Sequence, residues 1–293
     1  MEDKIISYGG QAVIEGVMMR GQKGFAIAMR APDGSIAVHK ESLAAVYRSK
    51  ITKIPFLRGV ILLWDALGLG MRALTVSANT QTGEDEKLEG PALYLTLGTS
   101  LAIGIGLFVL LPAGVGGWAE HSLGWQNLAH NLLEGVMRLI LLVGYIWGIG
   151  FMPDVKRLFG YHGAEHKTIN AYEAGVELTP ENVAKFPLEH PRCGTAFMLT
   201  FVLLAILVHS LLGDMSFAWR LASRILLSPV IAGIAVEFIR WTANHLDSPI
   251  VRFLIKPNLA LQSLTTREPD RFMLEVAIES FKTMRQAEQE LSL

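Results

Sequence analysis

The sequence predicts an α-helical membrane protein with about four transmembrane helices, a small N-terminal antiparallel β-sheet, and amphipathic helices at the membrane interface and the C-terminus. Three observations lead to this fold class. Of the 293 residues, 51% are hydrophobic and the mean hydropathy is +0.36, which is high for a water-soluble chain of this length. Four stretches reach the roughly 20 apolar residues that cross about 30 Å of hydrocarbon. Basic residues alternate between the connections of these stretches.

The predicted spans are residues 92–116, 129–152, 196–213 and 218–241. The first span has no charged residue and is rich in glycine and alanine, which favours close packing against another helix. The second carries Glu134 and Arg138, which lie one helical turn apart and can pair. The fourth has charges only near its ends, at Arg220, Arg224, Glu237 and Arg240. Such side chains can reach the membrane surface, so they are compatible with a span.

The distribution of lysine and arginine predicts the orientation. Connections 117–128 and 213–217 contain neither residue, whereas 153–195 contains five, and the segments before the first span and after the last are basic as well. Positively charged connections are retained in the cytoplasm. We therefore expect both termini and the long middle connection to be cytoplasmic.

The regions outside the spans are predicted as follows. Residues 1–55 form an N-terminal cytoplasmic β-rich region, with strands at 12–19, 25–29 and 36–39 and turns at 21–24 and 32–34. Residues 56–91 form an amphipathic helix to about Ala78 and a polar linker. Three charges within that helix favour a position at the interface over a further span, which is the main alternative. Residues 92–241 are the transmembrane region, including the 153–195 connection. Residues 242–293 form a helical cytoplasmic tail, in which Glu268, Pro269 and Asp270 suit the first turn of an amphipathic helix.

Composition also excludes several classes of function. The formal net charge is −1, so no overall basic field favours a nucleic-acid partner. Cys193 is the single cysteine, which excludes an internal disulfide and a four-cysteine zinc site within one chain. The first residues lack the apolar core of a signal peptide. The expected partner is the lipid bilayer, with another membrane protein complex as a further candidate.

The middle connection holds the residues that predict chemistry. If 162–173 is helical, His162 and His166 lie one turn apart on one face, where two imidazoles can bind one metal ion. The order His-x-x-Glu-His is the reversed zincin pattern, in which the glutamate, here Glu165, is the general base. His190 and Cys193 are candidates for a third ligand. Weaker candidates are Glu173, Glu237 and His245. The pattern predicts a zinc site.

Other interpretations of these residues remain open. His162, Glu165 and His166 also suit a hydrogen-bonded polar cluster next to lipid headgroups, and Gly163 is a poor helix former. Cys193 taken alone favours a buried structural thiol over a nucleophile. Glu15, within an apolar strand, favours a solvated strand position over a ligand. A further set of polar residues near the ends of the last three spans suits either an ion-pair network or a path for a proton or substrate: Glu134, Arg138, His209, Asp214, Arg220 and Arg224.

Four segments resemble the bacterial YqhQ-type membrane proteins. They are GGQAVIEGVMMRG at 9–21, HGAEHK at 162–167 with AYE at 171–173, HPRCGT at 190–195, and QSLTTREP at 262–269. The resemblance implies a multi-pass protein of the bacterial plasma membrane. It also implies the general label of that family, a predicted metal-dependent enzyme, and it supplies no substrate.

Two functions follow from the sequence. The first is a zinc-dependent hydrolase at the cytoplasmic face, acting on a membrane peptide or lipid, with Glu165 activating water. The alternative is a non-enzymatic scaffold or membrane-protein assembly factor that recruits another membrane complex. A transporter is less favoured, because four spans are few and no broken-helix pair is evident.

Overall fold

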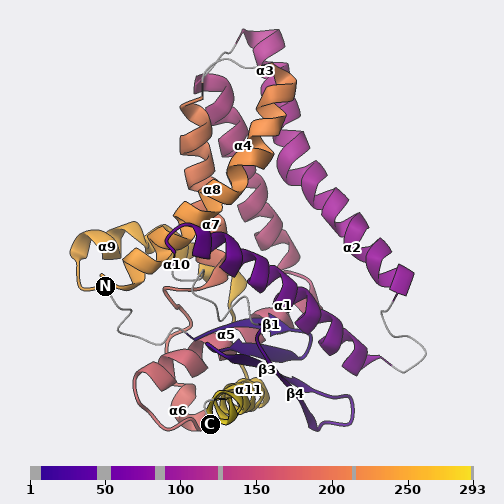
Figure 1. Ribbon diagram of the computed structural model, residues 1–293, viewed down its shortest axis with the longest axis vertical. Helices are drawn as coiled ribbons and strands as arrows, with labels where there is room; N and C mark the ends of the chain where they lie inside the picture. Colours follow the sequence, from indigo (N-terminus) through magenta and orange to yellow (C-terminus); the bar gives the residue numbers. More distant parts are fainter. Residues whose placement is uncertain (1–7, 45–53, 83–89, 125–127, 213–215, 292–293) are drawn as a thin grey trace.

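The computed structural model describes residues 8–44, 54–82, 90–124, 128–212 and 216–291. Figure 1 shows a bundle of long helices standing on a smaller part built around the sheet. Residues 83–89, which are part of the predicted linker, and Asp214 lie outside the described residues. A mostly helical chain with a small N-terminal antiparallel sheet is thus confirmed.

The sheet has four antiparallel strands in the order β1-β2-β3-β4. They are β1 (Gly9–Val13), β2 (Gly16–Arg20), β3 (Gly24–Arg30) and β4 (Ile36–Ser42). The prediction of one strand over 12–19 is wrong, because Val13 pairs with Gly16 across a two-residue turn. Glu15, the second residue of this turn, has φ 53°, and a type II turn places its second central residue at positive φ. Glu15 therefore lies in a turn and not on a solvated strand.

Both faces of the sheet are covered, which explains why β2 and β3 are almost completely buried. On one face, Val17, Met19, Ala26 and Ala28 pack against α5 (Pro153–Glu173) and α11 (Arg271–Glu290). On the other face, alternate residues pack against Ala73 of α1 (Leu57–Gln81). Successive residues of a strand point to opposite faces, so one short hairpin contributes to two cores. Figure 1 shows α1 on the side of the sheet that faces the bundle.

Helix α1 connects the sheet to the bundle. Near its start, a Cβ atom at Gly59 would lie 2.9 Å from Gly233 Cα of α8 (Phe217–Ala243), so the two helices meet at glycines. Further along, Gly70 lies against the side chain of Gln11 in β1. The outward side of α1 is apolar and exposed, with Trp64 at 73%. A position of α1 in the membrane interface remains a prediction.

The bundle contains α2 (Gly90–Ile105), η4 (Gly106–Leu110), α3 (Leu111–Leu123), α4 (Leu128–Ile149), α7 (Gly194–Ser210) and α8. The first predicted span is longer than expected, because the helix continues through Leu123 into the predicted 117–128 connection. The third is shorter, since α7 ends at Ser210.

Within the described residues, four helices are long and apolar enough to cross a membrane, namely Leu57–Gln81, Gly90–Leu123, Leu128–Ile149 and Ala218–Ala243. They include α1, while the shorter α7 is a further apolar helix. None of the residues of α2 is buried, and Tyr94 and Leu95 are about three-quarters exposed, at 74% and 73%. Exposed apolar surface on this scale favours contact with lipid.

Of the remaining helices, α6 (Pro180–Val183) contacts α5 and α11 in the smaller part. Helices α9 (Pro249–Leu254) and α10 (Lys256–Thr265) lie at the base of the bundle, where α10 contacts α7 and α4. The predicted amphipathic C-terminal helix is α11. Asp270 caps it by accepting a hydrogen bond from Met273 N at 2.8 Å.

The close packing of the sheet gives a test of the fold. A Cβ atom at Gly16 would lie 2.3 Å from the Ala28 carbonyl oxygen. We expect Gly16→Ala to lower the free energy of unfolding in detergent by about 1–3 kcal/mol, because the β2–β3 backbone has to shift. Gly98→Ala is the matched control, since a Cβ there meets nothing within 4 Å. Equal stabilities of the two variants would contradict this packing.

Candidate metal centre

Helix α5 carries the two candidate histidines, and two glycines bring it close to its neighbours. A Cβ atom at Gly163 would lie 2.2 Å from the Arg267 carbonyl oxygen, and one at Gly160 would lie 2.7 Å from Met273 Sδ. Neither position has room for a side chain, so α5 packs directly against α11 and the segment before it. The helix forms despite the low helix propensity of Gly163 because tertiary packing outweighs propensity.

His162 and His166 lie one turn apart on α5, and carbonyl groups fix both rings. His162 Nδ1 is 2.9 Å from the Thr265 carbonyl oxygen, and His166 Nδ1 is 2.5 Å from that of Leu188. A carbonyl oxygen only accepts hydrogen bonds, so both Nδ1 atoms carry a proton. A neutral imidazole of this kind keeps its lone pair on Nε2, which is how metal-binding histidines are commonly held.

Cys193 approaches the histidines from the residue before α7. Its Sγ accepts a hydrogen bond from Thr195 N at 3.4 Å and lies 3.2 Å from His162 Nε2. The residue is only 7% exposed. The thiol therefore faces the imidazole rather than solvent.

A side chain of α10 holds the segment that leads to Cys193. Gln262 is fully buried, and its Oε1 accepts from His190 N at 3.0 Å while its Nε2 donates to the His190 carbonyl oxygen at 2.9 Å. This pair of bonds resembles the pairing of two strands and fixes the backbone three residues before Cys193.

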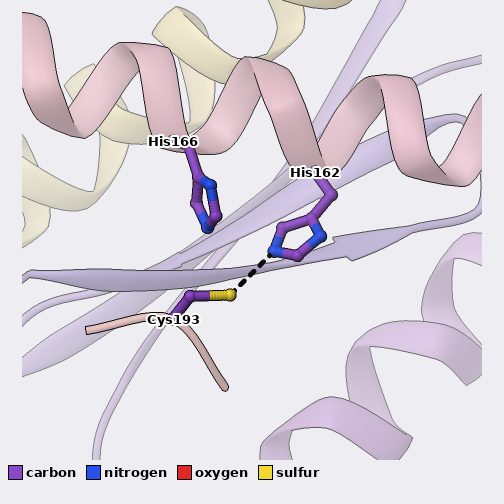
Figure 2. Close-up of side chains that lie close together, drawn as sticks. All are labelled: His162, His166 and Cys193. Carbon is purple, nitrogen blue, oxygen red and sulfur yellow. Dashed lines mark hydrogen bonds between the residues drawn. The ribbon is translucent and has the colours of Figure 1, made fainter. Parts of the chain in front are cut away.

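These contacts bring three potential ligands together. One donor atom each from His162, His166 and Cys193 lies within 4.8 Å of the other two. Figure 2 shows the two imidazoles projecting from α5 toward the cysteine, with the hydrogen bond between His162 and Cys193 dashed. Two nitrogens and one sulfur form a donor set that suits zinc and leaves one tetrahedral position free. This group could hold a metal ion.

Glu165 lies next to His166, one of the three donors. Its Oε2 is 3.5 Å from His166 Nε2, and the residue is 4% exposed. Burial raises the pKa of its carboxyl, while His162, His190 and a hydrogen bond from the Gly10 backbone act in the opposite direction. A Cβ atom at Gly10 would lie 2.6 Å from Glu165 Cγ, so β1 has a glycine where the carboxyl needs space.

Of the two predicted third ligands, the structure brings Cys193 into the group and places His190 behind His166, with ring centres 5.7 Å apart. His190 is buried, its Nε2 has no hydrogen-bond partner within the described chain, and the nearest carboxylate, that of Glu173, is 3.8 Å away. Burial lowers the pKa of His190, and Glu173 opposes this effect. Glu173 itself pairs with Arg192.

The other two of the three weaker candidates, Glu237 and His245, lie elsewhere. Glu237 accepts from Arg58 Nε at 2.6 Å, which joins α8 to α1. His245 Nδ1 donates to the Trp241 carbonyl oxygen at 2.7 Å, at the end of α8. Neither belongs to the group of three donors.

Several supporting residues were not identified from the sequence as part of the site. They are Gly10, Leu188, Gln262 and Thr265. Leu188 and Thr265 contribute only backbone carbonyls, which residue type does not reveal. Gly10, Gln262 and Thr265 lie in the segments that carry the family resemblance, so that pattern was the available signal.

Glu15 has a structural role, because its carboxylate is hydrogen-bonded to α5. Its carboxylate accepts from Arg157 Nε at 2.6 Å and from the Tyr161 hydroxyl at 3.2 Å, which ties the first hairpin to α5. The hydrogen bond from Arg157 lowers the pKa of Glu15 below its usual value of 4.5. Glu15 thus positions α5 and is not a member of the donor group.

The lowered pKa predicts a pH-dependent contribution to stability. A carboxyl whose folded-state pKa is depressed stabilises the protein above the unfolded pKa, and this contribution is lost as pH falls through the folded pKa. We expect Glu15→Gln to unfold at a lower temperature than wild type at pH 7, with the difference shrinking below pH 4.5. Thermal unfolding followed by circular dichroism would measure it. The exposed Glu279→Gln is the control, and a constant difference at all pH values would contradict the role of Glu15.

Two comparisons with known proteins identify the family. A family model described as a protein of unknown function (DUF1385) matches residues 54–287. The "Uncharacterized protein YqhQ" of Bacillus subtilis (strain 168) is 37% identical over 299 residues, which cover 96% of this chain and 93% of that protein. No solved structure matches the chain. Neither description names a metal, so the case for one rests on the side chains above. The resemblance found in the sequence is confirmed, and the chain belongs to this YqhQ-like family of unknown function.

Proposed function

We propose that the protein is a zinc-dependent hydrolase of the bacterial plasma membrane, with His162, His166 and Cys193 as the zinc ligands. The observation that carries the proposal is the convergence of these three donors, with both imidazoles oriented by backbone carbonyls. A polar cluster without a metal would not require a ligand atom of each residue to lie within 4.8 Å of the other two while carbonyls hold both Nδ1 atoms. The donor set also favours zinc over magnesium or calcium, which prefer oxygen ligands.

The arrangement supports catalysis because a carboxyl group, that of Glu165, lies beside one of the three proposed ligands, His166. A bound Zn²⁺ supplies Lewis-acid activation of water and of a carbonyl or phosphoryl oxygen. Glu165, 3.5 Å from His166, is placed to accept a proton from water and to return it to a leaving group. Gly10 gives this carboxyl room against β1 and fixes it with a backbone hydrogen bond.

The location favours a substrate at the membrane surface. Cys193 directly precedes α7, which runs from the smaller part into the bundle in Figure 1. The candidate site therefore lies at the base of the bundle, near the ends of the apolar helices. A substrate bound there would be a membrane peptide or a lipid. The basic residues of the 153–195 connection favour the cytoplasmic side for this site and for both termini.

Metal analysis of the purified protein tests the ligand set. We expect about one zinc per chain in detergent by elemental analysis, and at least about tenfold less in His162→Ala, His166→Ala and Cys193→Ala, because each removes one of three ligands. His39→Ala, on strand β4, is the matched control and should retain zinc. Absence of zinc from carefully purified wild type, or its retention in all three ligand variants, would contradict the proposal.

Glu165→Gln separates catalysis from metal binding. The variant should keep its zinc and lose at least about 100-fold in hydrolysis, because an amide cannot exchange the proton. The assay would use zinc-loaded protein in vesicles with panels of membrane peptides and phospholipids. Zinc-loaded wild type that hydrolyses neither panel would refute the hydrolase. Crosslinking that then recovers one dominant membrane complex would support the scaffold alternative.

The contact between Gln262 and His190 predicts an indirect effect on metal affinity. We expect Gln262→Ala to weaken zinc binding about 10- to 100-fold, because the segment leading to Cys193 loses both of its hydrogen bonds to α10. Competition with a chelator would measure the affinity. Ser263→Ala, the next and exposed residue of α10, is the control and should leave it unchanged. Equal affinities of the two variants would show that Gln262 does not position the ligand segment.

A further inference from the structure

A second polar centre lies at the end of the bundle far from the sheet. There α3 and α7 end and α4 and α8 begin, as their course in Figure 1 shows. Its central residue is Glu134, which is 1% exposed. Glu134 and Arg224 lie six and seven residues after the starts of α4 and α8, or roughly 10 Å into the bundle at 1.5 Å per residue.

Two arginines share the single carboxylate of Glu134. Arg224 donates from Nε at 3.0 Å and from Nη2 at 2.7 Å. Arg138, one turn further along α4, donates to the same carboxylate. Arg224 also donates to Asn131 Oδ1 at 3.2 Å, and Arg138 to the Phe108 carbonyl oxygen at 3.2 Å. Both of these acceptors are neutral, as is the Ser223 hydroxyl next to Arg224 Nη1.

This arrangement leaves one positive charge without a counter-charge. Among the residues that the structure describes, no carboxylate other than Glu134 pairs with Arg138 or Arg224. The neighbouring Arg220 has its own carboxylate partner, Glu120, at 2.8 Å. Two guanidinium groups and one carboxylate therefore carry a net charge of about +1 within an apolar bundle, since arginine stays protonated in proteins.

An unused hydrogen-bonding group lies beside these charges. His209, near the end of α7, is 4% exposed. The Ala205 carbonyl, one turn earlier, is the hydrogen-bonding group that acts on its ring, and neither ring nitrogen forms a hydrogen bond of good geometry within the described part of the chain. Arg224, Arg138 and Glu134 all act on the ring electrostatically. A buried histidine whose ring lacks well-formed hydrogen bonds is costly, so a ligand that accepts a hydrogen bond would stabilise it.

The position of Arg138 and Arg224 also disfavours the insertion of α4 and α8 into the membrane. In the proposed orientation they lie on the side away from the cytoplasm, where basic residues are disfavoured. An uncompensated charge at this depth costs free energy, and such residues commonly mark binding sites. An anion would remove the cost, and the planar guanidinium fork matches the oxygens of a phosphate.

We propose that Arg138, Arg224 and His209 form a binding site for a phosphate group, in addition to the candidate metal centre and independent of it. The side chain of Arg138 keeps 14% of its surface exposed, so an anion has access to it. The roughly 10 Å depth lies close to the lipid headgroups. The phosphate can therefore come from an anionic phospholipid or from free inorganic phosphate.

Charge variants test the site in opposite directions. Binding would be measured on the full-length protein in neutral detergent, with phosphatidylglycerol by native mass spectrometry and with inorganic phosphate by calorimetry. Arg138→Gln removes the excess charge and should weaken binding at least about tenfold. Glu134→Gln removes the internal counter-charge and should tighten it. Arg252→Gln, an exposed arginine on α9, is the control and should behave like wild type.

The two probes identify the source of the phosphate. Binding of phosphatidylglycerol without inorganic phosphate supports a lipid headgroup, and binding of both supports a site for the phosphate group itself. If Glu134→Gln does not fold, as judged by its thermal unfolding, His209→Leu replaces it and should weaken binding. Wild type that binds neither probe, or an Arg138→Gln variant that binds as tightly as wild type, would overturn the proposal. The zinc content should be the same in all of these variants.

Discussion

The close approach of α5 to its neighbours is the contact on which the candidate metal centre depends. Glycines at 160 and 163 let the helix touch Met273 and the Arg267 carbonyl, and Gly10 of β1 makes room for Glu165. Only with α5 at this distance can the carbonyls of Leu188 and Thr265 reach the two Nδ1 atoms. The sheet and α11 therefore serve to orient the two imidazoles. Burial of apolar side chains supplies the free energy that holds the helix in place.

Much of this arrangement could be predicted from the sequence, because it depends on local spacing. The i, i+4 separation of His162 and His166 places them on one face of any helix. The apolar stretches long enough to cross a membrane and the amphipathic pattern of the C-terminal helix could likewise be identified from the sequence. The hairpin turn at Glu15 was not, because a non-glycine residue at positive φ gives a weak local signal. Nor was the choice of Cys193 over His190, which depends on how Gln262 fixes a segment 72 residues away.

The predicted boundaries of the spans were wrong for a different physical reason. Hydropathy detects where a helix can contact lipid, but the end of a helix depends on capping and packing. The first helix continues past 116 because no residue stops it before Gly124, which adopts the left-handed conformation typical of a helix C-terminus. Helix α1 has the composition of a span, yet its inner side packs on the sheet and buries Asp65 against Arg20. Composition alone does not distinguish these two environments.

The two polar centres lie at opposite ends of the bundle and differ in how their buried groups are satisfied. At the candidate metal centre, a backbone carbonyl accepts a hydrogen bond from Nδ1 of each imidazole, which leaves Nε2 for a cation. At the far end, two guanidinium groups share one carboxylate and require an anion. Ion pairs in an apolar environment seldom stabilise a fold relative to apolar residues of similar volume. Stability alone therefore gives no reason for Arg138, Arg224 and His209 to lie together in the bundle, whereas a bound phosphate would balance their charge and offer a hydrogen-bond acceptor to His209.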